Sequence, residues 1–470
     1  MITTPRRFAS STHRRDAHWP RSAAALAATL LLASSPAAAQ LVAQPVDYDC
    51  TIIASTDEFP DGLPGAPTIN AWGRVAFHAR TAPGVTEVRS GIGDVDTQGI
   101  PITQAVARAG SVADADTYFY AIDLNPPRID DQSRIYWHGF AHGSGPPEIG
   151  VYRKDHDAAL DATPDARLLV QTADPTSPIL VLQPGFRVNG QGEMLFVGRR
   201  DGQAFDELLQ GSSSAASPLD GGASDWASHP ASQPWAAWTR FQGATQDLHL
   251  DSSTPRRSVD ASTRFMHGLS LAGGEIPLVS WIEDVFDVPG TSWQLRLASP
   301  IAESVEVDDG LDTTGTFSPP EQTTVNSFGE IAISGPTGEP LLFSDGDQLI
   351  EVRCQNALEL FGSFFFVDHD VSDRSINNEG QIAFRAETGL LVLPTFAEEA
   401  FIIRADPIST AHPSVCTALP DDTPCDDGDP ESLAYCTAGV CTPVPEPGVL
   451  AGLLAGGLAL GLLGARRTRS

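Results

Sequence analysis

Two groups of titratable side chains in this 470-residue chain are of types that catalysis could use. His78 and His138 each lie in a strand that follows a tight turn, at positions that we interpret as non-equivalent. We expect both to be exposed strand histidines, although they could meet at a site. Asp368, Asp370 and Asp373 could do the paired-carboxylate chemistry of a glycosidase, but aspartates beside a turn are more often caps or solvated side chains.

Aromatic side chains that could stack against sugars form a third group: Trp235, Trp238, Trp281 and Trp293. Two of them occupy the aromatic position of a repeated motif, which favours core packing. The chain contains no His-Glu-x-x-His motif, no Cys-x-x-Cys pair, no P-loop, no dinucleotide fingerprint and no Gly-x-Ser-x-Gly elbow. We therefore assign no catalytic residue and no metal ligand, and predict that the chain is not an enzyme.

The elements that must position these residues come from a motif whose best copy begins at Asn377. Ile376, Ile382, Phe384 and Ala386 alternate with polar or small residues, a period of two that predicts half-buried strands. Asn caps its own turn, and the Gly three residues later supplies the left-handed conformation that closes it. Each copy therefore predicts a β-hairpin.

The motif recurs along the chain. Four copies are clean: Asn70 with Gly73, Asn189 with Gly192, Asn326 with Gly329, and Asn377 with Gly380. The copy at Asp130 has Asp and Ser in place of Asn and Gly, and two weak copies begin at Ala231 and Gly274. The starts lie about 42 to about 60 residues apart, which is the range of propeller blades.

Further strand pairs lie between the motifs, such as the pair that flanks Asp345 and Gly346. One motif hairpin and one such pair make four strands for each repeat. We therefore predict an all-β fold for residues 45–410, a repeat architecture that forms a β-propeller of about seven blades. A β-solenoid and a row of sandwich domains are the alternatives.

Charge limits the partners of the chain. The formal net charge is −31, and Lys154 is the only lysine. Such an acidic chain repels nucleic acid and anionic lipid, so we predict no nucleic-acid partner.

The first 39 residues have the pattern of a signal peptide. Five arginines precede an apolar run at residues 23–33, and small residues follow up to Ala39. We predict cleavage after Ala39 and export of the body.

Six cysteines in an exported chain favour disulfides. Pairing of Cys50 with Cys354 gives the simplest even count, and we predict that Cys416, Cys425, Cys436 and Cys441 pair with one another. The last four lie in an acidic segment, residues 411–443, which is too short for an apolar core of its own. Its aspartates are candidate Ca²⁺ ligands, but a solvated linker pinned by disulfides is the favoured interpretation, so we predict no cofactor.

Residues 444–470 resemble a PEP-CTERM sorting signal. The resemblance is carried by Pro445, Glu446 and Pro447, by an apolar run at residues 449–465 that predicts a transmembrane helix, and by Arg466 and Arg467. It implies that an exosortase recognises and removes the tail, and that the inner membrane is contacted through this helix before processing. A plain C-terminal membrane anchor is the alternative.

The repeats resemble the bacterial surface proteins described as choice-of-anchor tandem-repeat NxxGxxAF proteins. That family is defined by its repeat and its anchors, so the resemblance implies no substrate. We expect an exported cell-envelope or extracellular-matrix protein with a non-catalytic structural or interaction role. Its expected partners are an exosortase during sorting and extracellular polysaccharide or other surface proteins. The alternatives are a propeller that binds carbohydrate or protein, and a secreted hydrolase.

Overall fold

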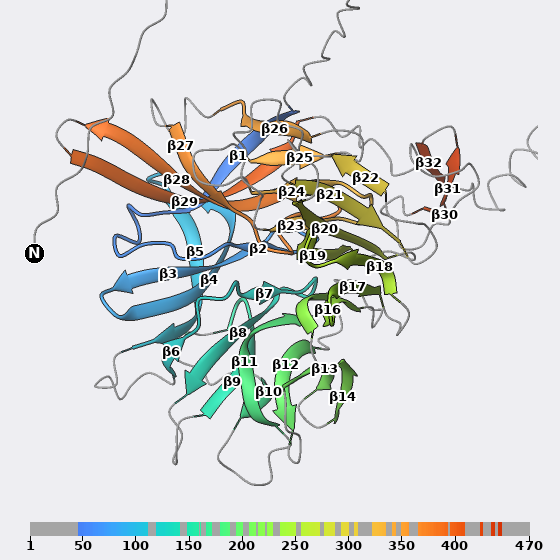
Figure 1. Ribbon diagram of the computed structural model, residues 1–470. Helices are drawn as coiled ribbons and strands as arrows, with labels where there is room; N and C mark the ends of the chain where they lie inside the picture. The colour runs from blue at the N-terminus through green and yellow to red at the C-terminus, as the bar shows by residue number, and fades with distance from the viewer. Residues whose placement is uncertain are drawn as a thin grey trace, which may run out of the picture. The chain divides into compact units, whose positions relative to one another are not determined.

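The chain divides into two compact units, residues 1–43 and 44–470. The computed structural model describes residues within the second unit: 46–110, 119–141, 148–158, 160, 166–171, 179–188, 194–200, 206–212, 215–220, 223–228, 236–250, 255–272, 277–286, 293–299, 305–308, 322–334, 341–344, 349–356, 365–392, 395–408, 424–425, 434–437 and 440–443. In these residues every regular element is a β-strand (Figure 1). This confirms the all-β fold class. No helix in the same residues is long and apolar enough to span a membrane.

Three sheets each contain four strands in chain order, every neighbouring pair antiparallel. The first contains β11 (Ile179–Val188), β12 (Met194–Arg200), β13 (Glu207–Ser212) and β14 (Ala215–Asp220). The second contains β15 (Ala223–Ser228), β16 (Ala236–Gln242), β17 (Thr245–Leu250) and β18 (Pro255–Asp260). The third contains β19 (Arg264–Ala272), β20 (Leu278–Val285), β21 (Trp293–Ala298) and β22 (Val305–Asp308).

An eight-stranded sheet joins two groups of four strands through one parallel pair. The first group contains β23 (Thr323–Val325), β24 (Ile331–Ile333), β25 (Leu342–Ser344) and β26 (Leu349–Cys354). The second group contains β27 (Phe365–Asp370), β28 (Ile382–Val392), β29 (Thr395–Pro407) and β1 (Val46–Ser55). The parallel pair is β26 with β1.

A nine-stranded sheet also divides at a parallel pair, here β5 with β6. On one side lie β2 (Thr68–Ile69), β3 (Val75–Ala82), β4 (Val85–Val95) and β5 (Pro101–Ala109). On the other side lie β6 (Phe119–Ile122), β7 (Arg128–Ile129), β8 (Arg134–Ala141), β9 (Glu148–Asp155) and β10 (Ala166–Gln171), with β6 and β7 both paired to β8. A separate three-stranded sheet contains β30 (Pro424–Cys425), β31 (Ala434–Thr437) and β32 (Val440–Pro443).

The repeated motif connects two antiparallel strands wherever it occurs. In five copies the residue before the motif pairs with the residue six positions later: Ile69 with Val75, Ile129 with Ile135, Val188 with Met194, Val325 with Ile331, and Ile376 with Ile382. In the two weak copies Ser228 pairs with Ala236, and Ala272 with Leu278. The centres of these two hairpins lie one residue earlier than expected for motifs that begin at Ala231 and Gly274. The predicted first residues of these two copies are therefore wrong by one position.

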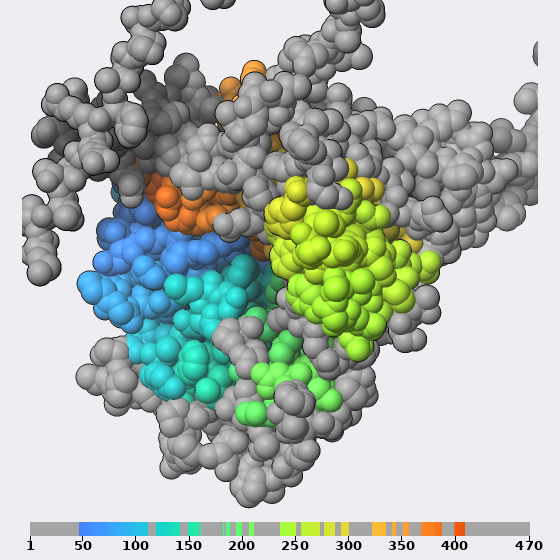
Figure 2. Space-filling view, viewed as in Figure 1, coloured from blue at the N-terminus to red at the C-terminus, as the bar shows by residue number. Residues whose placement is uncertain are grey.

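Apolar residues that alternate along these strands form the core. The strand after the last motif buries Ile382, Phe384 and Ala386 together with Ile403 of β29 and Phe343 of β25. Another cluster packs side chains of β16 and β17 against those of β19 and β20, and the described side chains of residues 236–299 form a packed surface (yellow-green to yellow in Figure 2). Apolar side chains of successive groups of strands are thereby removed from water together.

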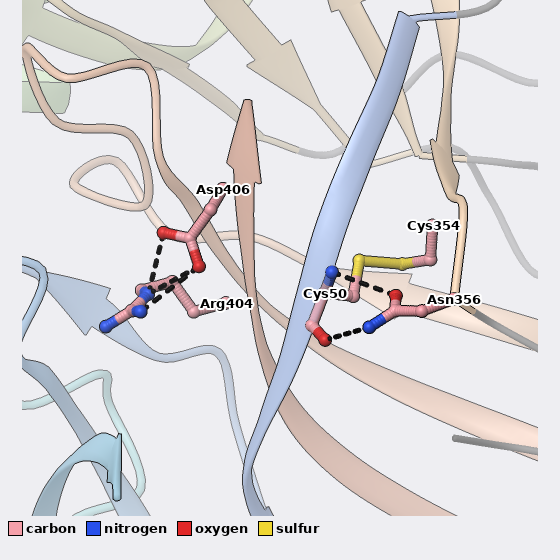
Figure 3. Close-up of a disulfide and its surroundings, with 5 residues drawn as sticks. All are labelled: Cys50, Cys354, Asn356, Arg404 and Asp406. Carbon is pink, nitrogen blue, oxygen red and sulfur yellow. Dashed lines mark hydrogen bonds and ion pairs between the residues drawn. A yellow bond between two sulfur atoms is a disulfide. The ribbon is translucent and has the colours of Figure 1, made fainter. Parts of the chain in front are cut away.

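The first strand of the described chain completes the group formed by its last long strands. β1 pairs antiparallel with β29, so blue β1 lies beside orange β29 in Figure 1. A disulfide joins Cys50 of β1 to Cys354 of β26, which is the pairing that the even count favours (Figure 3). The side chain of Asn356 adds two hydrogen bonds to the backbone of Cys50, at 3.0 Å to its nitrogen and 2.8 Å to its oxygen.

Candidate functional site: the motif turns and the segment between them

The first residue of each described motif caps its own turn. In the Asn70 copy the side-chain oxygen accepts hydrogen bonds from the backbone nitrogens of Trp72 at 3.1 Å and Arg74 at 2.9 Å. Asn326 and Asn377 accept the same two bonds, from the residues two and four positions later. An Asn side chain suits this position because its short amide reaches backbone groups of its own turn.

The side-chain nitrogen of the same Asn residues joins one turn to another. Asn326 donates to the backbone oxygen of Asn377 at 3.0 Å, Asn377 donates to that of Asn70 at 3.0 Å, and Asn70 donates to that of Asp130 at 3.2 Å. Four copies that lie far apart in sequence are therefore connected in series. All four side chains are buried, where a hydrogen bond left unmade would cost stability.

The fourth residue of each described motif has a positive φ. The values are 73° for Gly73, 80° for Gly329 and 71° for Gly380, and Ser133 takes the same conformation at 58°. Glycine adopts this region without a steric cost. Ser133 confirms that the Asp130 copy is a member of the repeat despite its two substitutions.

Aspartate replaces asparagine in that copy and forms different bonds. The second carboxylate oxygen of Asp130 accepts from Arg134 Nε at 2.6 Å and from the Tyr136 hydroxyl at 2.8 Å. Burial, together with the negative charge of Asp130, raises the pKa of Tyr136 above its ordinary range. Asp130 therefore keeps the turn cap but has no amide to donate to another turn.

The segment from Val371 to Ser375, just before the last motif, contacts several groups of strands. Ser372 Oγ and Ser375 Oγ both donate to the backbone oxygen of Pro67, at 2.8 and 3.0 Å. The backbone nitrogen of Ser375 donates to Thr324 Oγ1 at 3.0 Å. The backbone oxygen of Asp373 accepts from Ser270 Oγ at 2.9 Å.

A buried charge cluster surrounds the carboxylate of Asp373. Arg128 of β7 forms an ion pair with one oxygen, and Arg187 of β11 pairs with the other at 2.5 Å. Arg374 adds a third guanidinium and donates to the backbone oxygen of Val188 at 3.2 Å. Burial lowers the pKa of Arg128 to about 9, although the Asp373 carboxylate opposes that shift.

This cluster limits the chemistry of Asp373. Burial alone would raise the pKa of its carboxyl, but the charges of Arg128, Arg187 and Arg374 lower it below the ordinary value. A carboxyl held ionised in this way is a poor proton donor. The prediction that this aspartate is a cap or a solvated side chain is wrong, because it is buried and pairs with Arg128 and Arg187, which come from strands far away in sequence.

Asp368 and Asp370 lie apart from this ion pair, in β27. Asp370 pairs with Arg385 of β28 at 2.9 Å. Burial and the negative charge of Asp370 raise the pKa of Asp368. The structure therefore separates the three aspartates into a partly exposed pair and a buried structural residue.

The two histidines are equivalent and buried, so both sequence interpretations of them are wrong. Each lies eight residues after the first residue of its motif, and their exposed fractions are 0% for His78 and 3% for His138. His78 Nε2 lies 2.9 Å from the backbone oxygen of Asn125, and His138 Nδ1 lies 3.1 Å from Asp123 Oδ2. Both rings thus hold the connection between β6 and β7.

The protonation of these groups follows from their surroundings. Burial lowers the pKa of His78, and the second ring nitrogen has no hydrogen-bond partner in the described residues, so this ring is neutral with its proton directed at the carbonyl. Burial would raise the pKa of Asp123, but hydrogen bonds from His138 and Asn125 lower it. Among the described residues, no group of three or more His, Cys, Asp or Glu could hold a metal ion.

The tryptophans named as sugar-stacking candidates are core residues where the structure describes them. Trp238, Trp281 and Trp293 are buried, each in an apolar cluster, and this confirms the packing interpretation. Trp72 was missed, although it is 76% exposed. The signal that could have found it is its place inside a motif turn, outside the alternating apolar positions of the two strands.

Arg128, Arg187 and Arg374 were missed as well, and no local pattern in the sequence marks them. Other predicted residues lie outside the described part: Asn189, Gly192, Trp235, Cys416, Pro445, Glu446, Pro447, Arg466 and Arg467, with the signal peptide and the apolar tail. In the late Cys-rich segment only backbone is described. Its register places Cys436 opposite Cys441, and Cys425 opposite Ala434.

No protein-family model and no curated protein matches the chain. Among solved structures, prolyl oligopeptidase B from Galerina marginata is similar with a TM-score of 0.41 and 8% identity, over 76% of this chain and 53% of that one. This chain thus spans about half the length of that protein. A polysaccharide lyase, Uly1, gives a TM-score of 0.39 and 8% identity over 72% of this chain and 88% of that one. Likenesses this distant assign neither an activity nor a ligand.

Proposed function

We propose that this chain is an exported protein of the cell envelope or extracellular matrix, sorted by an exosortase, with a non-catalytic structural or interaction role. The observation that carries the proposal is that the polar groups of the repeat bond to other parts of the same chain. The Asn side chains join turn to turn, and Asp373 is enclosed by arginines. These groups connect copies of the motif within the chain, so their role is structural.

The architecture that we propose for the body is a closed β-propeller of seven blades. The support is the division of the described strands into seven groups of antiparallel strands, six with four strands and one, β6 to β10, with five, and each group contains one motif hairpin. β1 would complete the seventh blade, as the N-terminal strand does when a ring of blades is closed by both ends of the chain.

Export is supported by sequence and by covalent structure together. The basic, apolar and small-residue pattern of residues 1–39 is typical of a signal peptide. A disulfide between Cys50 and Cys354 is of the kind that persists in oxidising compartments. Removal of the tail at Pro445, Glu446 and Pro447 would then release the body from the inner membrane.

Fractionation of the native host tests this proposal. The wild-type protein is expected in the envelope or extracellular fraction, and a Glu446→Ala variant is expected to stay with the inner membrane because an altered motif is not processed. An Asp429→Ala variant, in the acidic segment upstream of the motif, is the matched control and should distribute as the wild type. Retention of both the wild type and the Glu446→Ala variant in the inner membrane would show that the tail is a plain anchor, and release of both would show that Glu446 is not needed for processing.

A further inference from the structure

Trp72 is an exposed aromatic side chain on the first motif turn. Its exposed fraction of 76% exceeds that of the other exposed large apolar side chains in the described residues, of which Phe286 follows at 65%. A ligand that covers such a ring removes apolar surface from water, which favours binding.

The ring is held in place despite its exposure. The indole Nε1–H donates to the backbone oxygen of Asp131 at 2.8 Å, and the backbone nitrogen of Trp72 donates to Asn70 Oδ1 at 3.1 Å. The next turn also binds the preceding residue, because Ala71 N donates to Asp131 Oδ1 at 3.2 Å. An aromatic side chain held in this way loses little conformational freedom when a ligand stacks on it.

The other described turns form without an exposed aromatic residue at this position. The third position of the other described turns is Gln132, Phe328 or Glu379, of which Gln132 and Glu379 are exposed and Phe328 is buried at 8%. An exposed aromatic residue therefore belongs to this copy and not to the repeat. Its indole bond to Asp131 orients the ring without covering it.

Polar side chains are exposed on the two motif turns that are hydrogen-bonded to the Trp72 turn. Asp131 and Gln132 are exposed on one neighbouring turn, and Glu379 is exposed on the turn whose Asn377 side chain bonds to Asn70. A protein hot spot is typically surrounded by packed contacts that exclude water, and no such packing covers this ring, which is 76% exposed. An exposed aromatic ring with carboxylate and amide groups on the adjoining turns suits a ligand with an apolar face and a hydroxyl edge, which describes a sugar ring.

We propose that Trp72 is the stacking residue of a saccharide-binding site on the face formed by the motif turns, with Asp131, Gln132 and Glu379 as acceptors for hydroxyl groups. The ligand class is a neutral polysaccharide, because two carboxylates at the site and a net charge of −31 repel an anionic one. This inference deepens the proposed non-catalytic interaction role and rests on it.

Affinity electrophoresis of the purified mature protein tests the inference directly. Native gels would contain hydroxyethylcellulose, mannan, galactomannan or dextran, with alginate as the anionic comparison. We expect retardation by at least one neutral polysaccharide, and a dissociation constant raised about tenfold or more by Trp72→Ala, since loss of an aromatic anchor costs on the order of 1.4 kcal/mol or more. Trp72→Phe should restore most of the binding.

Phe286→Ala is the matched control, because Phe286 is the next most exposed ring and should not alter retardation. A second measurement does not depend on variants: the same neutral polysaccharides should protect Trp72 of the wild type from N-bromosuccinimide, as read by peptide mapping. Absence of retardation by every neutral polysaccharide, retention of binding by Trp72→Ala, or retardation by alginate alone would overturn the inference. None of these outcomes depends on sorting, which the fractionation experiment tests separately.

Discussion

The amide of the motif asparagine has two structural roles at the scale of single residues. Its oxygen caps the turn that carries it, and its nitrogen binds a neighbouring turn, as in Asn70, Asn326 and Asn377. Asp130 retains only the first role, because a carboxylate has no N–H to donate. Substitutions at Asn70 can therefore separate the two contributions.

Asn70→Ala removes both the caps of Trp72 and Arg74 and the bond to the Asp130 turn. We expect a loss of about 1–3 kcal/mol in the free energy of unfolding, the range for a buried hydrogen-bonding group left without its partner. Asn70→Asp keeps the cap as Asp130 does but turns a carboxylate oxygen toward the backbone oxygen of Asp130, so its loss reports the link between the two turns. Urea midpoints measure both, with the exposed Gln98→Ala as control, and wild-type midpoints for both Asn70 variants would contradict this account.

The burial of His78 predicts a dependence of stability on pH. Its pKa is lowered in the folded state, so the unfolded chain binds a proton more readily. The contribution of His78 to the free energy of unfolding is therefore fully present above the pKa of the unfolded chain, about 6.5, and is lost as the pH falls toward the lower pKa of the folded state. The decrease in urea midpoint between pH 7.5 and pH 5.5 should be smaller in His78→Gln than in the wild type. Equal decreases would refute this role.

Lys154 provides a chemical probe of the folded state. It is the chain's only lysine, is 2% exposed, and donates to the backbone oxygens of Val106 and Leu160 at 3.2 and 3.3 Å. Amine-reactive acetylation of the native protein should therefore spare Lys154 and modify the N-terminal amine, while acetylation in urea should modify both. Peptide mass mapping distinguishes the cases, and rapid modification of native Lys154 would contradict its burial.

At the scale of elements, local pattern predicted the hairpins because their cause is local. The period of two marks the strands, and Asn with Gly marks the turn, so the turns at Asn70, Asn326 and Asn377 lie where predicted. The histidines were misjudged because burial depends on a connection from another part of the sheet. The Asp373 cluster could not be predicted, because Arg128 and Arg187 come from β7 and β11. The residues next to Asp373 in sequence do not indicate that these two strands lie beside it.

The disulfide between β1 and β26 is the element-scale link that we expect to matter most. It joins residues that are 304 positions apart, and removal of a native disulfide typically costs about 2–5 kcal/mol, mainly by relieving a constraint on the unfolded chain. Cys50→Ser/Cys354→Ser should lower the urea midpoint accordingly. Cys436→Ser/Cys441→Ser is the matched control and should leave unfolding of the body unchanged.

Peptide mapping without reduction checks the remaining pairings. We expect Cys416, Cys425, Cys436 and Cys441 to be linked among themselves, because Cys50 and Cys354 are bonded to each other in the structure. A peptide that links any of the late four to Cys50 or Cys354 would contradict the assignment.

At the scale of the whole molecule, we propose that the terminal segments determine where the disulfide-braced all-β body is located. In the proposed surface role, the net charge of −31 would repel anionic polymers and leave neutral surface polymers as partners. Trp72 would then be a point of contact with such a polymer, while the turn network keeps its face in place.

Export and removal of the tail are tested by the intact mass of the protein recovered from the envelope or extracellular fraction. We predict a mature chain that begins near Gln40, ends near the Pro445, Glu446 and Pro447 motif, and retains the disulfide between Cys50 and Cys354. A mass that includes every residue through Ser470, found in the inner-membrane fraction, would contradict the account and leave a membrane-anchored protein in its place.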